Sequence, residues 1–454
     1  MSGLKEECGV FGISLKKPSI EVIRDLYLGL FALQHRGQES CGIAYKENGS
    51  ISLLIRQGLV SGNFFKSLPF DKSTQLGIGH VRYSTFGGSN LVNAQPFVFN
   101  CNKGEIAIAH NGNIPNAQKI KDELIESGSI FQTTSDSEIL IHFLARNPIK
   151  NFEEALIDSL KNLKGAYSML MLYEDYLIAF RDPYGYRPLC FGRVDDGYVF
   201  ASETNALDLI GAKYVRDVKP GEIIFCKNGE LRESSFADTN KIQQCVFELI
   251  YFSRPDSIVF GESVHNVRIK MGEKLASQRK KDHDLVIPVP DSGNSAAMGF
   301  SRASGIPFEF GLIRNHYTGR TFIKPGQNMR VESVRIKLNP IKSIIKGKSL
   351  AVIDDSLVRG TTSSKIVKML RYAGAKEVHF YLSSPSILYS CFYGIDTPTR
   401  EELISSKNSP EKIAEIIGAD SVTFLDINNM RDCLTEPDKY CYACFDGSYS
   451  IPVE

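Results

Sequence analysis

The chain has 454 residues, more than one hydrophobic core normally serves, so its length predicts two or three domains. Hydrophobic residues make up 43% and charged residues 23%, which describes an ordinary soluble globular protein. The formal charge of +1 provides no overall field for nucleic acid or a membrane surface, so any anion site must be local.

Targeting signals are not visible in the sequence. No run approaches the roughly 18 apolar residues of a membrane span, and the start, MSGLKEECGVFGI, lacks the basic end of a signal peptide. We therefore expect a cytoplasmic protein without a membrane or nucleic-acid partner. In that compartment the 10 cysteines are core thiols, a nucleophile or metal ligands rather than a disulfide framework.

The first half of the chain predicts an α+β mixture of short strands separated by Gly and Asn turns. Strand candidates include GVFGISL, LGIGHVRYS, EIAIAHNG and YSMLMLY. Helical patterns lie near residues 19–34, 117–128, 135–145 and 151–163. No period of 20 to 50 residues repeats, which excludes a repeat array.

Cys8, followed by Gly-Val-Phe-Gly-Ile, is the first candidate for chemistry. A lone cysteine at a strand start is more often a small buried hydrophobe than a nucleophile. Four later segments change that weighting: Gln34-His35-Arg36-Gly37-Gln38, His80-Val81-Arg82-Tyr83-Ser84-Thr85, His110-Asn111-Gly112-Asn113 and Ser135-Asp136-Ser137-Glu138. Together they resemble the glutaminase domain of N-terminal-nucleophile amidotransferases, the class II glutamine amidotransferases. The resemblance implies an αββα layered domain.

The same resemblance implies a catalytic constellation. The Cys8 thiol attacks the glutamine amide carbon, which gives an oxyanion and then a thioester with release of ammonia. The Asn111 side chain and the Gly112 N–H form the oxyanion hole, while Arg82 pairs with the substrate carboxylate and Asp136 with its ammonium. If Cys8 becomes the first residue, its own α-amino group, with an ordinary pKa near ~7.7–8.0, acts as the base.

Plainer interpretations exist for each residue taken alone. Arg82 and Asp136 would form a structural ion pair, and His110-Asn-Gly a hairpin turn. His80 and Arg36 are expected to support the loops of the site rather than to act chemically. Because Cys8 is not second in the chain, the resemblance implies that residues 1–7 are a propeptide removed before Cys8.

Residues 234–241, SSFADTNK, are polar and without periodicity, and we expect the domain boundary there, with domains of residues 8–238 and 239–454. Beyond it the strand candidates LVIPVP, PFEFGLI, SLAVID, EVHFYLSS and SVTFLD alternate with helices. Such alternation predicts a mainly parallel α/β sheet.

Residues 350–362, LAVIDDSLVRGTT, are the most informative stretch of the second half. An apolar strand ends in Asp354 and Asp355, and a hydroxyl-rich turn leads into a helix over 363–373. Ligands of open α/β sheets bind at such strand ends, where backbone N–H groups wrap phosphate and carboxylates hold sugar hydroxyls directly or through Mg²⁺. An ordinary strand–turn–helix with an exposed acidic pair is the alternative.

The string resembles the 5-phosphoribosyl-1-pyrophosphate (PRPP) loop of type I phosphoribosyltransferases. The resemblance implies that Asp354 and Asp355 join Ser292 around one Mg²⁺ per subunit; a helix N-cap is the alternative for Ser292.

Residues 314–337 are basic with one acid, Glu332, and predict a lid or binding loop rather than a solvated charge run. The residues implied to bind PRPP are Asp354, Asp355, Arg359, Gly360, Thr361, Thr362, Arg320, Lys324 and Arg335.

Both halves together resemble the glutamine PRPP amidotransferases (amidophosphoribosyltransferases) over essentially the whole chain. The resemblance implies that glutamine and PRPP give 5-phosphoribosylamine, glutamate and pyrophosphate, the first step of purine synthesis. It also implies a homotetramer inhibited by purine nucleotides. The alternative is a PRPP-sensing regulator without turnover, which would tolerate loss of Cys8, Arg82 or Asp136; all three are present.

Cys441 and Cys444 form a C-x-x-C pair, which alone suggests zinc or a redox pair at least as readily as a cluster. Cys245 and Cys391 match the positions that complete one [4Fe–4S] cluster per subunit in the iron–sulfur subgroup of the family. Cys433 is a spare nearby, and the alternative is that all are core thiols.

Overall fold

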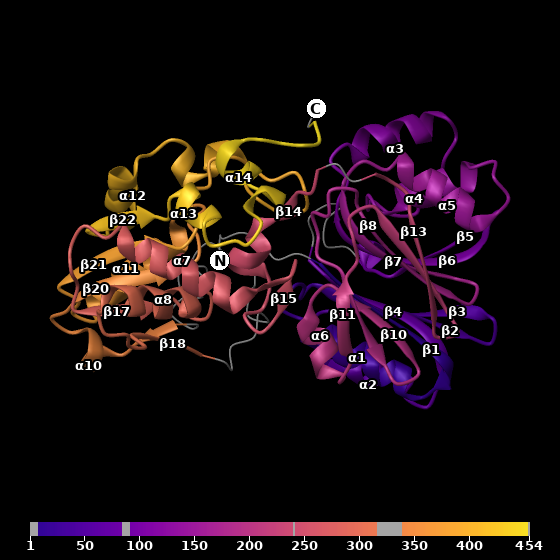
Figure 1. The fold of residues 1–454 in the computed structure, drawn as a ribbon, viewed down its shortest axis with the longest axis horizontal. Coiled ribbons are helices and arrows are strands. Elements are labelled where there is room, and N and C mark those ends of the chain that lie inside the picture. The colour runs from indigo at the N-terminus through magenta and orange to yellow at the C-terminus, as the bar shows by residue number, and fades with distance from the viewer. Residues whose placement is uncertain (1–7, 84–90, 239–240, 316–337, 453–454) are drawn as a thin grey trace.

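The computed structural model describes residues 8–83, 91–238, 241–315 and 338–452, which form two lobes (Figure 1). The first half of the chain makes the lobe on the right of the view, and the second half makes the lobe on the left. Arg320, Lys324 and Arg335 lie outside the described residues, as do residues 1–7 and 239–240. No helix of the described part is long and apolar enough to cross a membrane.

The first lobe stacks two antiparallel sheets with helices on both outer faces (Figure 1). One sheet has the order β11-β9-β10-β1-β4-β2-β3, with strands at Lys213–Asp217, Cys190–Val194, Gly197–Ala201, Gly9–Ser19, Thr74–Arg82, Ser40–Glu47 and Ser50–Gln57. The other has the order β13-β12-β8-β7-β6-β5, with strands at Glu230–Ser235, Glu222–Lys227, Tyr176–Arg181, Ala166–Tyr173, Gly104–Asn113 and Phe97–Cys101. The expected αββα layering is confirmed.

The helices of this lobe cover opposite faces of the stack. Helices α1 (Glu21–Ala32) and α6 (Thr204–Leu209) pack on the first sheet, and α3 (Ala117–Glu126), α4 (Glu138–Arg146) and α5 (Phe152–Lys161) pack on the second. The close fit of α1 depends on glycine, because a Cβ at Gly77 of β4 would lie 2.5 Å from the Leu26 side chain.

The alternation of side chains along β6 explains how the layers form. Ile106 and Ile108 pack against the outer helices, whereas Ala107 and Ala109 face the other sheet. Small residues on the inner face let the two sheets approach closely. The same two-residue period places the side chain of Asn111 on the inner face, where β6 reaches the end of the stack.

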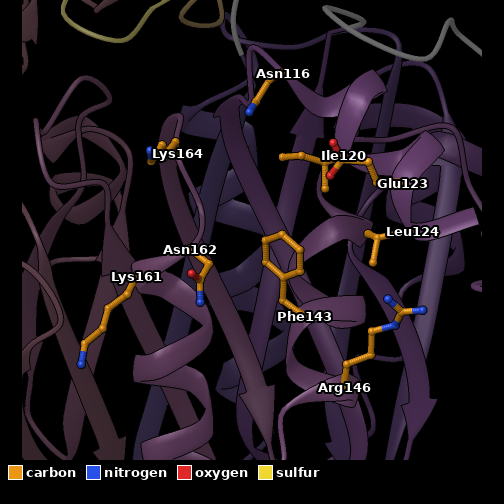
Figure 2. Close-up of a pocket in the computed structure, with 9 residues that line it drawn as sticks. All are labelled: Asn116, Ile120, Glu123, Leu124, Phe143, Arg146, Lys161, Asn162 and Lys164. Atoms are coloured by element: carbon orange, nitrogen blue, oxygen red, sulfur yellow. The ribbon is translucent and has the colours of Figure 1, made fainter. Parts of the chain in front are cut away.

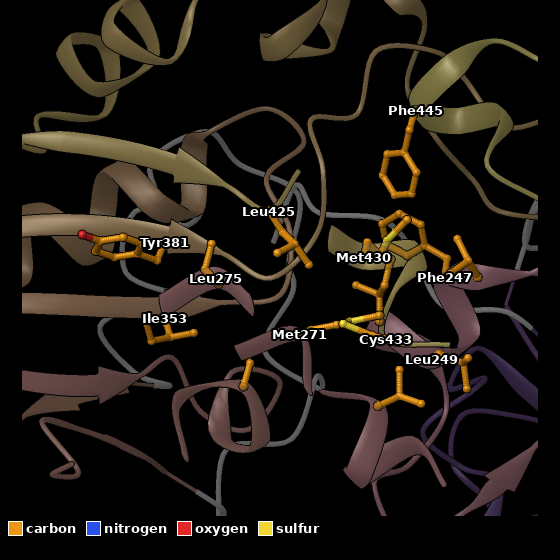
Figure 3. Close-up of a cluster of buried hydrophobic side chains, with 14 of the residues drawn as sticks. Phe247, Leu249, Met271, Leu275, Ile353, Tyr381, Leu425, Met430, Cys433 and Phe445 are labelled. Atoms are coloured by element: carbon orange, nitrogen blue, oxygen red, sulfur yellow. The ribbon is translucent and has the colours of Figure 1, made fainter. Parts of the chain in front are cut away.

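The second lobe is built on a parallel sheet with the order β17-β20-β21-β22, at Leu285–Pro288, Ser349–Asp354, Glu377–Leu382 and Ser421–Phe424. Helices α7 (Val264–Ser277), α8 (Asn294–Ser304) and α13 (Ile427–Arg431) cover one face, and α11 (Thr361–Tyr372) and α12 (Pro410–Ile417) cover the other. Figure 3 shows the core on the α7 side, which extends from Ile353 to Phe247 and Phe445 beside the first lobe. The expected α/β domain is confirmed.

The prediction that residues 307–313 form a strand of this sheet is wrong. The segment PFEFGLI makes an isolated parallel bridge, Val286 to Phe308, and its end, β18 (Leu312–Arg314), pairs antiparallel with β19 (Leu338–Pro340) in a separate ribbon. Its alternating apolar residues predicted a strand, but the Gly311 N–H turns back to the Glu309 carbonyl at 3.0 Å. That turn takes the chain away from the sheet edge.

Candidate active sites

Cys8 directly precedes β1 and lies at the end of the stacked sheets. Its Sγ donates to the Tyr83 carbonyl at 3.4 Å, and the residue is 9% exposed. Burial raises the pKa of the Cys8 thiol to about 11, although the nearby Arg82 charge opposes the shift. The thiol is therefore protonated at neutral pH, and its use as a nucleophile requires a base.

Asn111 and Gly112 lie within β6, paired with Ser168 and Tyr167 of β7, so the hairpin-turn interpretation is wrong. Asn111 is 1% exposed, and its Nδ2 has no hydrogen-bond partner among the described residues. A buried amide donor without a partner is costly, and it suits a group that must stabilise a transient oxyanion. At Gly112 a Cβ would lie 2.0 Å from the Ala166 carbonyl oxygen, so only glycine fits there.

Arg82 and Asp136 supply opposite charges near this site. Arg82 is 5% exposed, with Nη1 3.9 Å from Oε2 of Glu39. Asp136 precedes α4 and accepts from the Ile114 N–H at 2.9 Å. Burial tends to raise the pKa of Asp136, but the interactions with His110, the Ile114 N–H bond and the Lys121 charge together lower the pKa. A buried cation and an ionised carboxylate match the α-carboxylate and α-ammonium of an amino acid.

Asp354 is the last residue of β20 in the second lobe and Asp355 follows it. They are 7% and 6% exposed, so the interpretation as an exposed acidic pair is wrong. The Ser292 hydroxyl donates to Asp354 Oδ1 at 3.2 Å, and the Asp355 N–H donates to the same oxygen at 2.9 Å. Burial, followed by the Asp355 charge, raises the pKa of Asp354. Ser292 is not a cap, because α8 has Gly293 at its N-cap position without a side-chain bond.

The loop after the acidic pair leads into α11, which begins at Thr361, two residues earlier than predicted. Gly360 has a φ of 72°, which favours glycine, and it turns the chain into the helix. The N–H groups of the first helical turn, at Thr361 and Thr362, lack partners within the helix and form the positive end of its dipole. Arg359 pairs with Glu402 at 3.1 Å.

The four predicted cluster cysteines come together between the lobes. Cys245 of β14 (Gln244–Cys245) lies opposite Cys441 of β23 (Tyr440–Cys441), and Cys444 is in α14 (Ala443–Asp446). With Cys391 they line one small cavity. Burial raises the pKa of Cys444, and the charges of the other three add to the shift. Cys433 is a core thiol, whose Sγ donates to the Asn429 carbonyl at 3.2 Å.

This thiol-lined cavity fits the donor set of an iron–sulfur cluster, which takes four cysteine thiolates. All 10 cysteines are free thiols. Among the described residues, however, no group of three or more His, Cys, Asp or Glu side chains is arranged to hold a metal ion, so this cavity matches the cluster in its residue types and not in ligand geometry. The Asp354 and Asp355 pair instead fits Mg²⁺, which is commonly bound through one or two carboxylates plus substrate phosphates and water.

A different hollow, of about 470 Å³, lies among the outer helices of the first lobe (Figure 2). Ile120, Leu124 and Phe143 form its apolar wall, and Arg146 lies at one side. No predicted site residue lines it.

Sequence reasoning missed three buried charged residues beside the site: Arg187, Glu203 and Glu248. Glu248 carried a signal, since it interrupts the apolar run Val246-Phe247-Glu248-Leu249-Ile250, where an acid needs a buried partner. Arg187 lies in the loop between β8 and β9, and Glu203 lies between β10 and the start of α6; neither position was distinctive in the sequence.

A buried cysteine heading two stacked sheets, joined to a parallel sheet with an acidic pair at a strand end, defines a glutamine amidotransferase coupled to a phosphoribosyltransferase-type lobe. Residues 80–209 match the family described as "Glutamine amidotransferase domain". Amidophosphoribosyltransferase 3, chloroplastic, of Arabidopsis thaliana is 49% identical over 99% of this chain and 84% of its own length. The Bacillus subtilis amidophosphoribosyltransferase is 45% identical over 100% of this chain and 96% of its own.

A solved structure gives the same result for the fold. The glutamine PRPP amidotransferase of B. subtilis, complexed with ADP and GMP, superposes with a TM-score of 0.91 at 44% identity, covering 98% of both chains. The chain belongs to the amidophosphoribosyltransferase family.

Proposed function

We propose that this protein converts glutamine, PRPP and water into 5-phosphoribosylamine, glutamate and pyrophosphate, the first step of purine synthesis. The observation that carries the proposal is the presence of two sites in one chain, Cys8 near the unpartnered Asn111 amide and the buried Asp354–Asp355 pair beside Ser292. The family relationship supports the same reaction, since the relatives are named for it. A PRPP sensor without turnover has no use for a buried nucleophile beside an unpartnered amide.

In the first lobe, hydrolysis begins when the Cys8 thiol loses its proton. Because burial raises the pKa of that thiol to about 11, a base must lie beside it. Removal of residues 1–7 supplies the base, the α-amino group of Cys8 itself. Sγ then attacks the amide carbon, and Asn111 Nδ2 and the Gly112 N–H stabilise the oxyanion of the tetrahedral intermediate. Collapse of this intermediate releases ammonia and leaves a thioester on Cys8. Water releases glutamate, while Arg82 and Asp136 hold its α-groups.

In the second lobe, ammonia attacks C1 of PRPP and pyrophosphate leaves. Asp354 and Asp355, with Ser292 beside them, would hold one Mg²⁺, which when bound would neutralise charge on the departing pyrophosphate. Arg359, Gly360, Thr361 and Thr362 form the turn that cradles phosphate with backbone N–H groups. Arg320, Lys324 and Arg335, outside the described residues, complete the phosphate contacts in this proposal.

Further properties belong to the same proposal. Cys245, Cys391, Cys441 and Cys444 would hold one [4Fe–4S] cluster that ties the C-terminal segment to the body of the protein; amide transfer moves no electrons, so its role is structural. Purine nucleotides act as inhibitors, which the ADP and GMP in the B. subtilis complex support. The assembly is a homotetramer in the cytoplasm.

The test mixes the protein with glutamine, PRPP and Mg²⁺ and measures glutamate and pyrophosphate together. We expect both products in equal amounts, and an intact mass that lacks residues 1–7. Cys8→Ala should abolish glutamate release yet keep 5-phosphoribosylamine formation from added ammonia. Cys101→Ala, a half-buried thiol of β5, serves as the matched control. PRPP binding without either product would favour the sensor, and full activity with residues 1–7 retained would reject the α-amino base.

A further inference from the structure

The backbone carbonyl of the nucleophile is held by an arginine that reaches the other lobe. Arg36 donates from Nε to the Cys8 carbonyl at 3.0 Å. The same guanidinium donates from Nη2 to Glu248 Oε1 at 2.7 Å and from Nη1 to Glu248 Oε2 at 3.0 Å. Glu248 opens the short helix Glu248–Phe252, which belongs to the core of the second lobe. The position of Cys8 is thus tied to a carboxylate of that lobe.

A second arginine connects the same carboxylate to the oxyanion side of the site. Arg187 Nη1 lies 3.6 Å from Glu248 Oε1, and Arg187 Nε donates to the Tyr393 carbonyl at 2.9 Å. The neighbouring Phe392 carbonyl accepts from Asn113 Nδ2 at 2.9 Å. Asn113 follows the oxyanion pair directly in β6, so this chain of contacts ends at the other half of the site.

Gly394 brings the segment against the oxyanion glycine itself. A Cβ added at Gly394 would lie 3.2 Å from the Gly112 carbonyl carbon and 3.1 Å from Arg187 Nη2. Backbone of the second lobe therefore lies in close contact with the residue whose N–H is assigned to the oxyanion hole. A shift of this segment cannot leave Gly112 unmoved.

The charges of this network are fully buried, with no exposure of the side chains of Arg36, Arg187 and Glu248. Glu203 of the first lobe also pairs with Arg36, at 2.6 Å. Buried ion pairs add little net stability, because desolvation offsets their attraction, but they hold their partners in a defined geometry. This network contacts both the nucleophile and the oxyanion side of one site. We therefore interpret it as fixing the positions of these groups rather than as adding to the stability of the fold.

We propose that Glu248 is a positioning residue for glutamine hydrolysis, which aligns the Cys8 nucleophile with the oxyanion hole through Arg36 on one side and Arg187 on the other. The inference rests on the proposed function. Glu248 is assigned no contact with glutamine, so its removal leaves substrate binding by Arg82 and Asp136 in place. Misalignment of reacting groups by about 1 Å costs up to roughly a hundredfold in rate.

The test is Glu248→Gln, which keeps the size of the side chain and removes its charge. We expect kcat for glutamine to fall by about tenfold to a hundredfold with little change in KM. Formation of 5-phosphoribosylamine from added ammonia should stay within about twofold, since that route bypasses Cys8. Glu222→Gln is the matched control, because it cuts a bidentate Arg–Glu pair, to Arg216 at 2.8 Å, away from the site.

A second variant tests the oxyanion side. Gly394→Ala adds a methyl group at a φ of 107° against Gly112, whereas the control Gly418→Ala adds one at a φ of 81° where the nearest atom is 3.9 Å away. Both carry backbone strain, so a loss of glutamine-dependent kcat in Gly394→Ala alone reports on the contact. If Glu248→Gln does not fold, the comparison of Gly394→Ala with Gly418→Ala tests the proposal instead.

The outcomes separate the possibilities. Normal glutamine kcat in folded Glu248→Gln, or equal loss of the glutamine and ammonia reactions, overturns the positioning role. If Gly394→Ala is the deciding variant, a glutamine kcat equal to that of Gly418→Ala overturns it. A wild-type protein that releases no glutamate at all instead overturns the proposed function.

Discussion

The Ser292 hydroxyl donates a hydrogen bond to Asp354 Oδ1 at 3.2 Å, although the two residues are 62 positions apart in the chain. They meet because β17 and β20 are neighbouring parallel strands whose carboxyl ends share one edge of the sheet. That edge is where a phosphorylated sugar is expected to bind.

The acidic pair should be required for one half-reaction only. We expect Asp354→Asn with Asp355→Asn to lower PRPP-dependent product formation by more than about a hundredfold, because a Mg²⁺ ion held by this pair, as proposed, would contribute several kcal/mol to charge stabilisation. Basal glutaminase activity at Cys8 should remain. The control is Asp432→Asn, an exposed partner of Lys274. Unchanged 5-phosphoribosylamine formation in the double variant would reject the site.

The amide of Asn111 should act on the transition state rather than on substrate binding. Its Nδ2 has no partner among the described residues, so it is available to the oxyanion. We expect Asn111→Ala to lower glutaminase kcat by about 10²–10³-fold with little effect on KM. Asn162→Ala, an exposed change at the end of α5, should leave both constants unaltered. A raised KM at constant kcat would assign Asn111 to binding instead.

The cysteine-lined cavity should hold an iron–sulfur cluster that supports folding. Protein purified without oxygen should be brown, with about four irons and four sulfides per chain. Cys441→Ser should lose colour and thermal stability together, because metal ligation contributes directly to folding. Cys433→Ser, a nearby core thiol, should keep its colour. Colourless anaerobic protein with one zinc, or none, and full activity would return these residues to core thiols.

Acid should destabilise the protein partly through His80. Burial lowers the pKa of His80 to about 3 from the ordinary 6.5, so between these values the unfolded chain binds a proton that the folded chain does not. The stability contribution is complete above pH 6.5 and is lost as the pH falls toward 3. At pH 5 the loss is about 2 kcal/mol.

We expect the drop in Tm between pH 7.5 and pH 5 to be smaller in His80→Gln than in the wild type. His265→Gln, a partly exposed position on α7, should keep the wild-type drop. An identical drop in His80→Gln would show that another group titrates in this range.

Local patterns in the sequence were sufficient for the chemistry and for much of the scaffold. Strands such as β6 and β20 were predictable because a two-residue or continuous apolar pattern depends only on neighbouring residues. Asp354 was recognisable for the same reason, since it stands in a short, chemically distinctive string, whereas Cys8 was recognised only together with four later segments. In contrast, β2 was missed, because serine and glycine at its start hide the alternation of SCGIAYKE.

The tertiary structure determined which residues of these motifs come into contact. Only the family resemblance placed Cys245 near Cys441, which it faces across β14 and β23, and nothing in the sequence indicated that Glu248 reaches Arg36. Sheet order and the packing of one lobe on the other set those contacts, and they depend on the burial of many residues far apart in the chain. Short sequence motifs identify the residue types that carry the chemistry, whereas tertiary packing determines how these residues are aligned.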